Sequence, residues 1–221
     1  MHLVFATKNQ GKVKEVRELL AELGATVDTM DAVGTFDIEE TGTTFEENAK
    51  IKSDTVMQAI LQGATAAAQA RKEGLPVAPF YDTEPVFAVL SDDSGLEVDA
   101  LDKAPGVYSA RFMGEETSYE EKNAKILSLL QHTPEPKRTA RFVSVISATL
   151  ADGRHFITRG TVEGIIGYEC KGENGFGYDP IFYVPEKGKY MAEMTMEEKN
   201  AISHRGKALR AMKEVLRGLK E

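Results

Sequence analysis

Residues 89–98 read V-L-S-D-D-S-G-L-E-V, and they place two carboxylates, Asp92 and Asp93, directly after an apolar run. Successive side chains of a strand point to opposite faces of a sheet, so at most one carboxylate joins a given site unless the strand has ended. The Ser94-Gly95 pair indicates that the strand is ending there. Because an unpaired buried carboxylate is costly, this segment is either a solvated turn or part of a site that holds a cation.

Composition narrows the class of protein. The chain has 221 residues, which suits one large domain or two small ones, and its content of 42% hydrophobic and 28% charged residues is ordinary for a soluble globular protein. No apolar run is long enough to cross a membrane, and the first residues lack the pattern of a secretory signal. The single cysteine, Cys170, favours a reducing cytoplasm. A net charge of -8 argues against a nucleic-acid polymer as partner, although local lysines or a divalent metal still allow one small anionic ligand.

Hydrophobic spacing predicts an α/β fold with a mixed sheet, because strands alternate with helices and a long hairpin follows. Residues 61–86 are rich in glycine, alanine and proline, and we expect them to be a helix extension and a surface loop, inserted into a single domain over 1–221. Strands are predicted over 3–6, 86–90, 141–150 and 155–166, and helices over 12–24, from 45 onward, over 119–130 and from about 203.

The stretch A-T-K-N-Q-G-K, residues 6–12, joins the first strand to the first helix. The N–H groups of a helix N-terminus attract anions, Asn9 has the side chain of a helix cap, and a lysine such as Lys12 adds a full charge. The spacing is not that of a P-loop. The stretch therefore indicates either a phosphate-binding turn or a capped helix with a solvated lysine.

A second polar stretch, residues 38–52, leads into the second helix. Glu47 has capping-box spacing from Thr44, so it either closes that box or joins a metal site. Glu40 is not placed to cap the helix. Together with Asp93 it would supply the two carboxylate ligands that Mg²⁺ commonly has, with phosphate and water oxygens as its other ligands. Lys52 lies four residues after Asn48, on the same helix face.

Two further stretches contain residues that are candidates for binding a ligand. Residues 172–180, G-E-N-G-F-G-Y-D-P, combine glycines that let the backbone approach a ligand with two aromatic rings able to stack on a planar group. Residues 197–207 place His204 and Arg205 in the first turn of the last helix if Ser203 caps it. Cations are unfavourable at that end of a helix dipole, which hints at an anionic or acceptor-rich ligand.

Together, and in this order, these stretches resemble the inosine/xanthosine triphosphate pyrophosphatase family. The resemblance runs from Val4 to about Leu216. It rests on the motifs A-T-K-N-Q-G-K, E-E-T-G-T-T-F-E-E-N-A-K-I-K, S-D-D-S-G-L-E-V-D-A-L, P-G-V-Y-S-A-R-F, G-F-G-Y-D-P-I-F and I-S-H-R-G-K-A-L. It implies an elongated α/β fold of two lobes with the active site in the cleft between them, and usually a homodimer. It also implies Mg²⁺-dependent hydrolysis of non-standard purine nucleoside triphosphates to monophosphate and pyrophosphate.

The resemblance also implies residue roles. Glu40 and Asp93 match metal ligands, and Asp93 also matches the proton acceptor. The positions that match substrate contacts are Thr7, Lys8, Asn9, Gln10, Gly11, Lys12, Lys52 and Ser94 toward the polyphosphate, and Phe176, Gly177, Tyr178, Asp179, Lys199, His204 and Arg205 toward the base. The chain departs from the family pattern at Lys8, where a glycine is common, and in the long stretch 61–86.

Two other readings compete with this one. A related pyrophosphatase of the septum-formation-inhibitor type would act on modified pyrimidine or guanosine triphosphates, but S-H-R-G and G-F-G-Y-D-P belong to the purine pattern. A non-catalytic nucleotide-sensing module would be expected to lack a carboxylate, yet Glu40, Glu47, Asp92 and Asp93 are all present.

Overall fold

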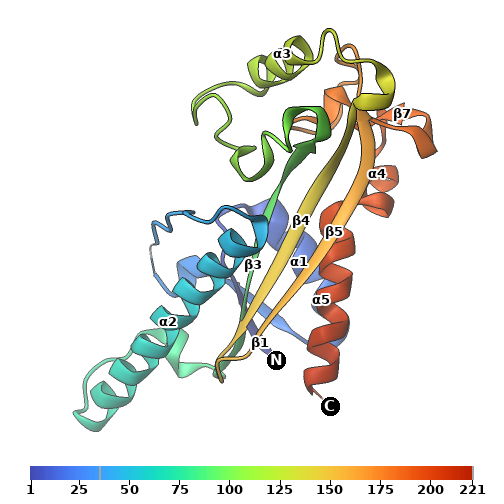
Figure 1. Ribbon diagram of the computed structural model, residues 1–221. Helices are drawn as coiled ribbons and strands as arrows, with labels where there is room; N and C mark the ends of the chain where they lie inside the picture. Colours follow the sequence, from blue (N-terminus) through green and yellow to red (C-terminus); the bar gives the residue numbers. More distant parts are fainter. Residues whose placement is uncertain (35, 221) are drawn as a thin grey trace. The chain divides into compact units, whose positions relative to one another are not determined.

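The computed structural model describes residues 1–34 and 36–220, apart from the side chains of Gln10 and Lys220 (Figure 1). The strands among these residues form one sheet of seven, in the order β2-β1-β3-β4-β5-β6-β7. Their bounds are β1 His2–Phe5, β2 Thr26–Thr29, β3 Val86–Val98, β4 Thr139–Leu150, β5 His155–Ile166, β6 Phe182–Val184 and β7 Lys189–Tyr190.

The sheet is mixed, which confirms the predicted α/β class. Strand β1 pairs in parallel with both β2 and β3, whereas β6 pairs antiparallel with β5 and β7. The predicted hairpin is present, since β4 and β5 are joined by a turn in which the Leu150 N–H donates to the Arg154 carbonyl. The strands β2, β6 and β7, which have only two to four residues, were not predicted from the sequence.

The helices begin where their capping residues predict. The α-helices are α1 Gln10–Leu20, α2 Phe45–Lys72, α3 Tyr119–Leu129, α4 Met196–Ile202 and α5 His204–Lys220. Asn9 caps α1, and Thr44 forms a capping box with Glu47 at the start of α2. The last helix begins after Ser203, as expected, but the short α4 before it was not predicted. None of the described helices combines the length and apolar character needed to span a membrane.

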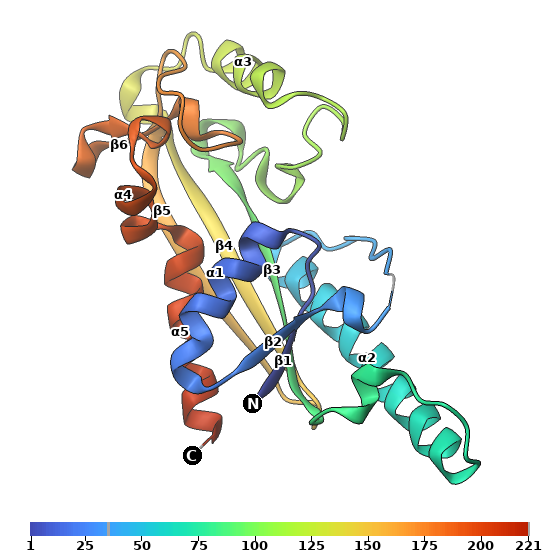
Figure 2. The same cartoon turned by 180° about the vertical axis from the view of Figure 1, so that it is seen from behind.

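The described chain divides into two compact units, and the long strands β3, β4 and β5 contribute to both. The first unit contains residues 1–93, 145–158 and 209–221, and the second contains 94–144 and 159–208. In the first unit, α2 covers one face of the sheet, while α1 and the end of α5 cover the other (Figures 1 and 2). The cleft expected between two lobes stays a prediction.

Each unit has its own apolar core. Buried side chains of the first unit, most of them on β1, β3 and α2, pack into one cluster: Val4, Ala6, Met30, Val56, Met57, Ile60, Val86 and Val89. Those of the second unit, from α3, the far halves of the long strands and the following segments, pack into another: Leu96, Val98, Ile126, Leu130, Ala140, Phe142, Val162, Ile166, Tyr178, Ile181, Phe182, Val184, Met191 and Met194.

Strand β3 does not end at the two carboxylates. It continues through Asp92, Asp93, Ser94 and Gly95 to Val98, so the prediction of a strand over 86–90 with a turn after it was wrong. The pairing of β3 with β1 ends at Leu90, and beyond that point β3 continues with β4 as its neighbour in the sheet. As a result the two carboxylates keep the alternation of a strand, and each belongs to a different face.

The segment 61–86 is partly what the sequence predicts. It extends α2 to Lys72 and then forms a loop with one short turn, and most of its side chains are exposed. It is not wholly outside the core, however, because Phe80 packs against the first unit's cluster and Val86 already belongs to β3. We propose that the rest, residues 64–78, is a peripheral insertion. A Cβ at Gly63 would lie 1.8 Å from the Tyr81 hydroxyl, so the two ends of this span lie close together.

Replacing residues 64–78 by a short Gly/Ser linker should lower the melting temperature by less than about 5 °C, because closing a short loop costs little. Circular dichroism melts measure this. Phe80→Ala is the control, and it should cost about 1–3 kcal/mol because Phe80 contacts the core. The proposal is contradicted if the linker variant loses cooperative melting while Phe80→Ala melts like the parent. In that case residues 64–78, and not the contact of Phe80 with the core, would support the fold.

Candidate functional site

The turn before α1 is built by two side chains that hold backbone N–H groups. Asn9 Oδ1 accepts hydrogen bonds from the Gly11 and Lys12 N–H groups, at 3.0 and 3.2 Å, and Thr7 Oγ1 accepts from the Asn9 N–H at 3.2 Å. The side chain of Lys8 is exposed. The side chain of Gln10 lies outside the described part of the chain. The predicted cap is confirmed, and the phosphate role of this turn stays a prediction.

The Lys12 side chain is partly buried, because its ammonium reaches across to β3. Lys12 Nζ lies 2.7 Å from Asp92 Oδ2, and Asp92 is 2% exposed. The ion pair with Lys12 explains why Asp92, to which the sequence analysis assigned no role, can be buried. Asp92 therefore belongs to the sheet face that α1 covers, together with the turn at residues 7–12.

Asp93 belongs to the opposite face, where α2 lies. Lys52 Nζ on α2 donates to Glu40 Oε1 at 2.9 Å and lies 3.6 Å from Asp93 Oδ1. Lys52 is mostly buried, and burial opposes its charge, but Asp93, Asp92 and Glu40 outweigh that effect and raise its pKa. The structure thus brings the two predicted metal ligands, Glu40 and Asp93, to one ammonium group.

The proton affinity of Asp93 is unusually high for a carboxyl group. Burial raises the pKa of Asp93 to about 6, with further increases from the charges of Glu40 and Asp92. Lys52 acts in the opposite direction, and so does the nearby side-chain amide of Asn48. Desolvation is the largest cause, and one lysine shared between two carboxylates does not cancel it.

The donor set fits a hard divalent cation in one specific way. Within residues 1–34 and 36–220, there is no group of three or more His, Cys, Asp or Glu side chains able to hold a metal ion by themselves. Mg²⁺ does not require one, since it usually takes one or two carboxylates and completes its octahedron with water and substrate phosphates. Glu40 and Asp93 are such a pair, and the ammonium of Lys52 between them marks the place as one that favours positive charge.

Glu47 does not join this group. Its Oε2 accepts hydrogen bonds from the Thr43 N–H at 2.6 Å, the Thr43 hydroxyl at 2.9 Å and the Thr44 N–H at 3.2 Å. These bonds complete the N-terminal cap of α2 and lower the pKa of the Glu47 carboxyl. Of the two alternatives for Glu47, the helix cap is therefore the one that the structure contains.

A second group of predicted residues lies in the second unit, around the loop 172–180. Asp179 Oδ2 accepts from the Phe176 N–H at 2.9 Å and forms an ion pair with Lys199. Lys199 Nζ also lies 4.6 Å from the centre of the Phe176 ring, which is 70% exposed. The carboxylate thus fixes an exposed ring and a cation side by side, as stacking on a planar group requires.

The remaining predicted residues of this unit have structural partners. Tyr178 is buried, and its hydroxyl donates to the Ser109 carbonyl at 2.7 Å. Gly177 has a φ of 68°, which suits glycine. Ser94 Oγ donates to Ser144 Oγ at 2.9 Å. These contacts hold the predicted residues in place, but by themselves they assign no ligand.

His204 and Arg205 open α5, as predicted. The His204 ring stacks on Phe142 with 5.3 Å between ring centroids and an interplanar angle of 15°. The helix start packs tightly on β5, because a Cβ at Gly160 would lie 2.2 Å from the His204 carbonyl oxygen. Glycine at this position therefore lets the first turn of α5 approach the strand.

Sequence reasoning missed a further residue of the second unit. Asn123 on α3 is 3% exposed, and its Nδ2 donates to the Gly177 carbonyl at 3.0 Å. The signal available was a polar residue at a core position of an amphipathic helix, next to Ile126. Because its partner is 54 residues away, no local spacing points to it.

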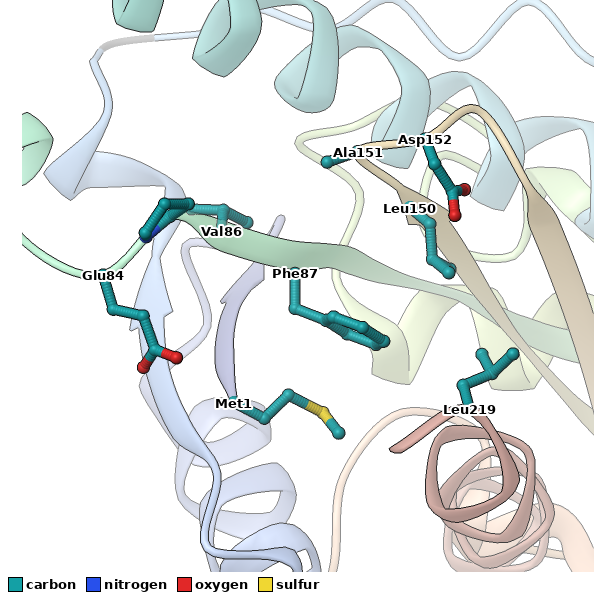
Figure 3. Close-up of a pocket in the computed structure, with 9 residues that line it drawn as sticks. Met1, Glu84, Val86, Phe87, Leu150, Ala151, Asp152 and Leu219 are labelled. Atoms are coloured by element: carbon teal, nitrogen blue, oxygen red, sulfur yellow. The ribbon is translucent and has the colours of Figure 1, made fainter. Parts of the chain in front are cut away.

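The first unit also contains a pocket of about 580 Å³ at the other end of its strands (Figure 3). Phe87, Leu150 and Leu219 point into it, as Figure 3 shows. None of the predicted site residues lines it, so it is not part of the candidate site. The lining residues are Met1, Glu84, Pro85, Val86, Phe87, Leu150, Ala151, Asp152 and Leu219.

The fold and the first group of residues define a mixed-sheet α/β protein that gathers carboxylates and lysines around one strand. The chain belongs to the Ham1 family, whose profile matches residues 3–215.

Similar proteins and solved structures agree with this membership. A protein of Exiguobacterium sibiricum named dITP/XTP pyrophosphatase is 47% identical over 217 residues, covering 98% of this chain and 97% of its own length. The solved Ham1 protein of Staphylococcus aureus has a TM-score of 0.80 at 39% identity, and covers 99% of both chains. A Mycobacterium abscessus structure, titled nucleoside-triphosphatase / dITP/XTP pyrophosphatase, has a TM-score of 0.71 at 33% identity, covering 96% of this chain and 98% of its own.

The raised pKa of Asp93 has a consequence for stability that Asp93→Asn tests. A carboxyl group whose pKa is higher in the folded state stabilises that state at low pH, and the stabilisation is lost as the pH rises through about 6. At pH 8 the parent buries a charge that the variant lacks. In metal-free buffer the variant should therefore be more stable at pH 8, by up to about 3 kcal/mol, and the gain should shrink at pH 4.5.

Urea unfolding with a chelator at both pH values measures this difference. Asp92→Asn is the matched control, and it should destabilise the protein, because it leaves the Lys12 ammonium without its buried partner. A gain that is the same at both pH values, or a loss at pH 8, would contradict the assigned proton affinity.

Proposed function

We propose that this protein hydrolyses non-standard purine nucleoside triphosphates (ITP, dITP and XTP) to the nucleoside monophosphate and pyrophosphate, and so removes deaminated purines from the nucleotide pool. One observation carries the proposal: the Lys52 ammonium held between Glu40 and Asp93, where charges able to bind metal and phosphate converge. The similarity to proteins named dITP/XTP pyrophosphatase supports the substrate class.

We also propose that the reaction depends on Mg²⁺ held by Glu40 and Asp93. When bound, the ion would neutralise phosphate charge and orient a water molecule for in-line attack. Lys52 lies against both carboxylates, so its ammonium is placed to bind a phosphate oxygen once a divalent cation shares their charge. The remaining steps depend on the protein's own side chains.

Asp93 is the proton acceptor in this proposal. A general base works best when its pKa lies close to the working pH, and in the metal-free protein burial raises the pKa of Asp93 to about 6, closer to neutral pH than that of an exposed aspartate. The water whose proton Asp93 takes attacks the α-phosphorus, since the products are a monophosphate and pyrophosphate. Lys12, Lys52 and the N–H groups of the first turn of α1 bind polyphosphate oxygens.

The second unit supplies the residues proposed to bind the base. Phe176 is exposed and stacks on the purine ring, while Lys199, His204 and Arg205 offer mainly hydrogen-bond donors. Hypoxanthine and xanthine present a carbonyl acceptor at ring position six, where adenine presents an amino donor. A donor facing a donor leaves both unsatisfied, and sites of this kind reject the mismatched analogue by about 10⁴–10⁵.

Kinetics with ITP and ATP test the function and this selectivity together. We expect kcat/KM for ITP to exceed that for ATP by several orders of magnitude, on the order of 10⁴. Arg205→Ala should narrow that ratio, while Arg210→Ala, exposed on the same helix, should leave it unchanged. If Arg205→Ala lowers kcat/KM by the same factor for ITP and for ATP, hydrogen-bond donors do not select the base.

The product distinguishes this function from its rivals. Orthophosphate should appear only when inorganic pyrophosphatase is added to the reaction. Direct orthophosphate release would assign a different bond, activity on pyrimidine or guanosine triphosphates alone would favour the septum-formation-inhibitor type, and binding without turnover would favour a nucleotide sensor.

Two further parts of the proposal have their own tests. The family resemblance implies a homodimer, which sedimentation analysis tests. The single cysteine favours a cytoplasmic location, which fractionation of cells tests.

A further inference from the structure

Three hydroxyl groups form a buried row between α2 and β4 in the first unit. Ser53 and Ser147 are 0% exposed and Thr149 is 8% exposed. The contacts run from His155 Nε2 to Ser147 Oγ at 2.7 Å, on to Ser53 Oγ at 2.7 Å, on to Thr149 Oγ1 at 2.9 Å, and end on Asp54 Oδ1 at 2.7 Å. A buried polar row of this kind is costly unless every member is satisfied.

Counting hydrogens fixes the direction of the row. Its contacts need one hydrogen each, and the three hydroxyls supply one fewer than the four contacts require. Asp54 supplies none, because both of its carboxylate oxygens accept, Oδ1 from the Thr149 hydroxyl and Oδ2 from the Lys50 ammonium. The missing hydrogen must therefore come from His155 Nε2. Every hydroxyl then accepts from the member before it and donates to the next, and Ser53 shares its hydrogen with the Lys50 carbonyl, 3.1 Å away.

The opposite direction does not work. If Nε2 of His155 were an acceptor, Ser147 would donate to it and Ser53 would donate to Ser147. Thr149 would then have one hydrogen for both Ser53 and Asp54, and one close oxygen–oxygen contact would be left without a hydrogen. Of the two neutral tautomers, only the Nε2–H form gives each of the four contacts of the row a hydrogen of its own.

We propose that this row, called here the hydroxyl relay (His155, Ser147, Ser53, Thr149 and Asp54), positions Lys52 against Glu40 and Asp93. Ser53 directly follows Lys52 in α2, so the relay fixes the helix at the turn that carries the ammonium. An apolar contact would let the helix slide along the sheet, whereas hydroxyls have to meet particular partners, and a shift by one residue breaks the relay at Ser53. The members of the relay are positioning residues, because the contacts that define it are with one another.

The tautomer of His155 tests the relay without any assay of activity. In ¹⁵N–¹H correlation spectra of the full chain at neutral pH, the His155 ring should be the Nε2–H tautomer. Ser147→Ala removes its partner and should shift the ring nitrogen signals toward those of an exposed histidine. An Nδ1–H tautomer in the parent would overturn the proposal.

Kinetics test the action on Lys52, and this part rests on the proposed function. Thr149→Val removes the hydroxyl at nearly constant shape and should lower kcat/KM for ITP about tenfold, whereas Thr149→Ser keeps the hydroxyl and should stay near the parent. Thr65→Ala, which removes a hydroxyl elsewhere on α2, should have no effect.

A double-mutant cycle separates positioning from a general loss of stability. In a Lys52→Met background, Thr149→Val should change the residual kcat/KM by less than about twofold, because the group that the relay positions is already absent. An equal loss in both backgrounds, or equal behaviour of Thr149→Val and Thr149→Ser, would overturn the proposal. If the parent hydrolyses no purine triphosphate, the proposed function fails, while the tautomer still decides whether the relay exists.

Discussion

The ammonium of Lys52 between Glu40 and Asp93 is the interaction on which the site depends. Two carboxylates brought together in a mostly buried place repel each other and lose their solvation, so a cation must accompany them. In the protein by itself this cation is Lys52. In the proposed reaction Glu40 and Asp93 would hold a divalent ion that shares their charge, and the Lys52 ammonium would then be available for a phosphate oxygen.

Several separate features of the chain serve this arrangement. The alternation of β3 sends Asp92 to Lys12 on α1 and Asp93 toward Lys52 on α2, so one dipeptide supplies both faces of the sheet. The capping box at Thr44 starts α2 at the point that brings Lys52 level with Asp93. The hydroxyl relay then fixes the same helix against β4, and the proton affinity of Asp93 follows from how closely these elements pack.

The sequence predicted those parts of the structure that depend on neighbouring residues. The caps at Asn9 and Thr44 are local hydrogen bonds, so composition and spacing were sufficient to find them. The end of β3 was predicted wrongly, because Ser94-Gly95 favours a break in an isolated strand, whereas here β3 continues beside β4 after its pairing with β1 has ended at Leu90. The pairing of Lys12 with Asp92 and of Asn123 with Gly177 joins residues that are 80 and 54 positions apart, and no local pattern encodes either pair.

The proton affinity of Asp93 is measured most directly by ¹³C NMR titration of its carboxyl carbon in metal-free protein, with the signal assigned by Asp93→Asn. The expected midpoint in the parent is about pH 6. Because Lys52 lowers the pKa of Asp93, the midpoint should move upward in Lys52→Met. A parent midpoint near the ordinary value of about 4, unchanged by Lys52→Met, would contradict the coupling of burial, lysine and carboxylate from which the mechanism is derived.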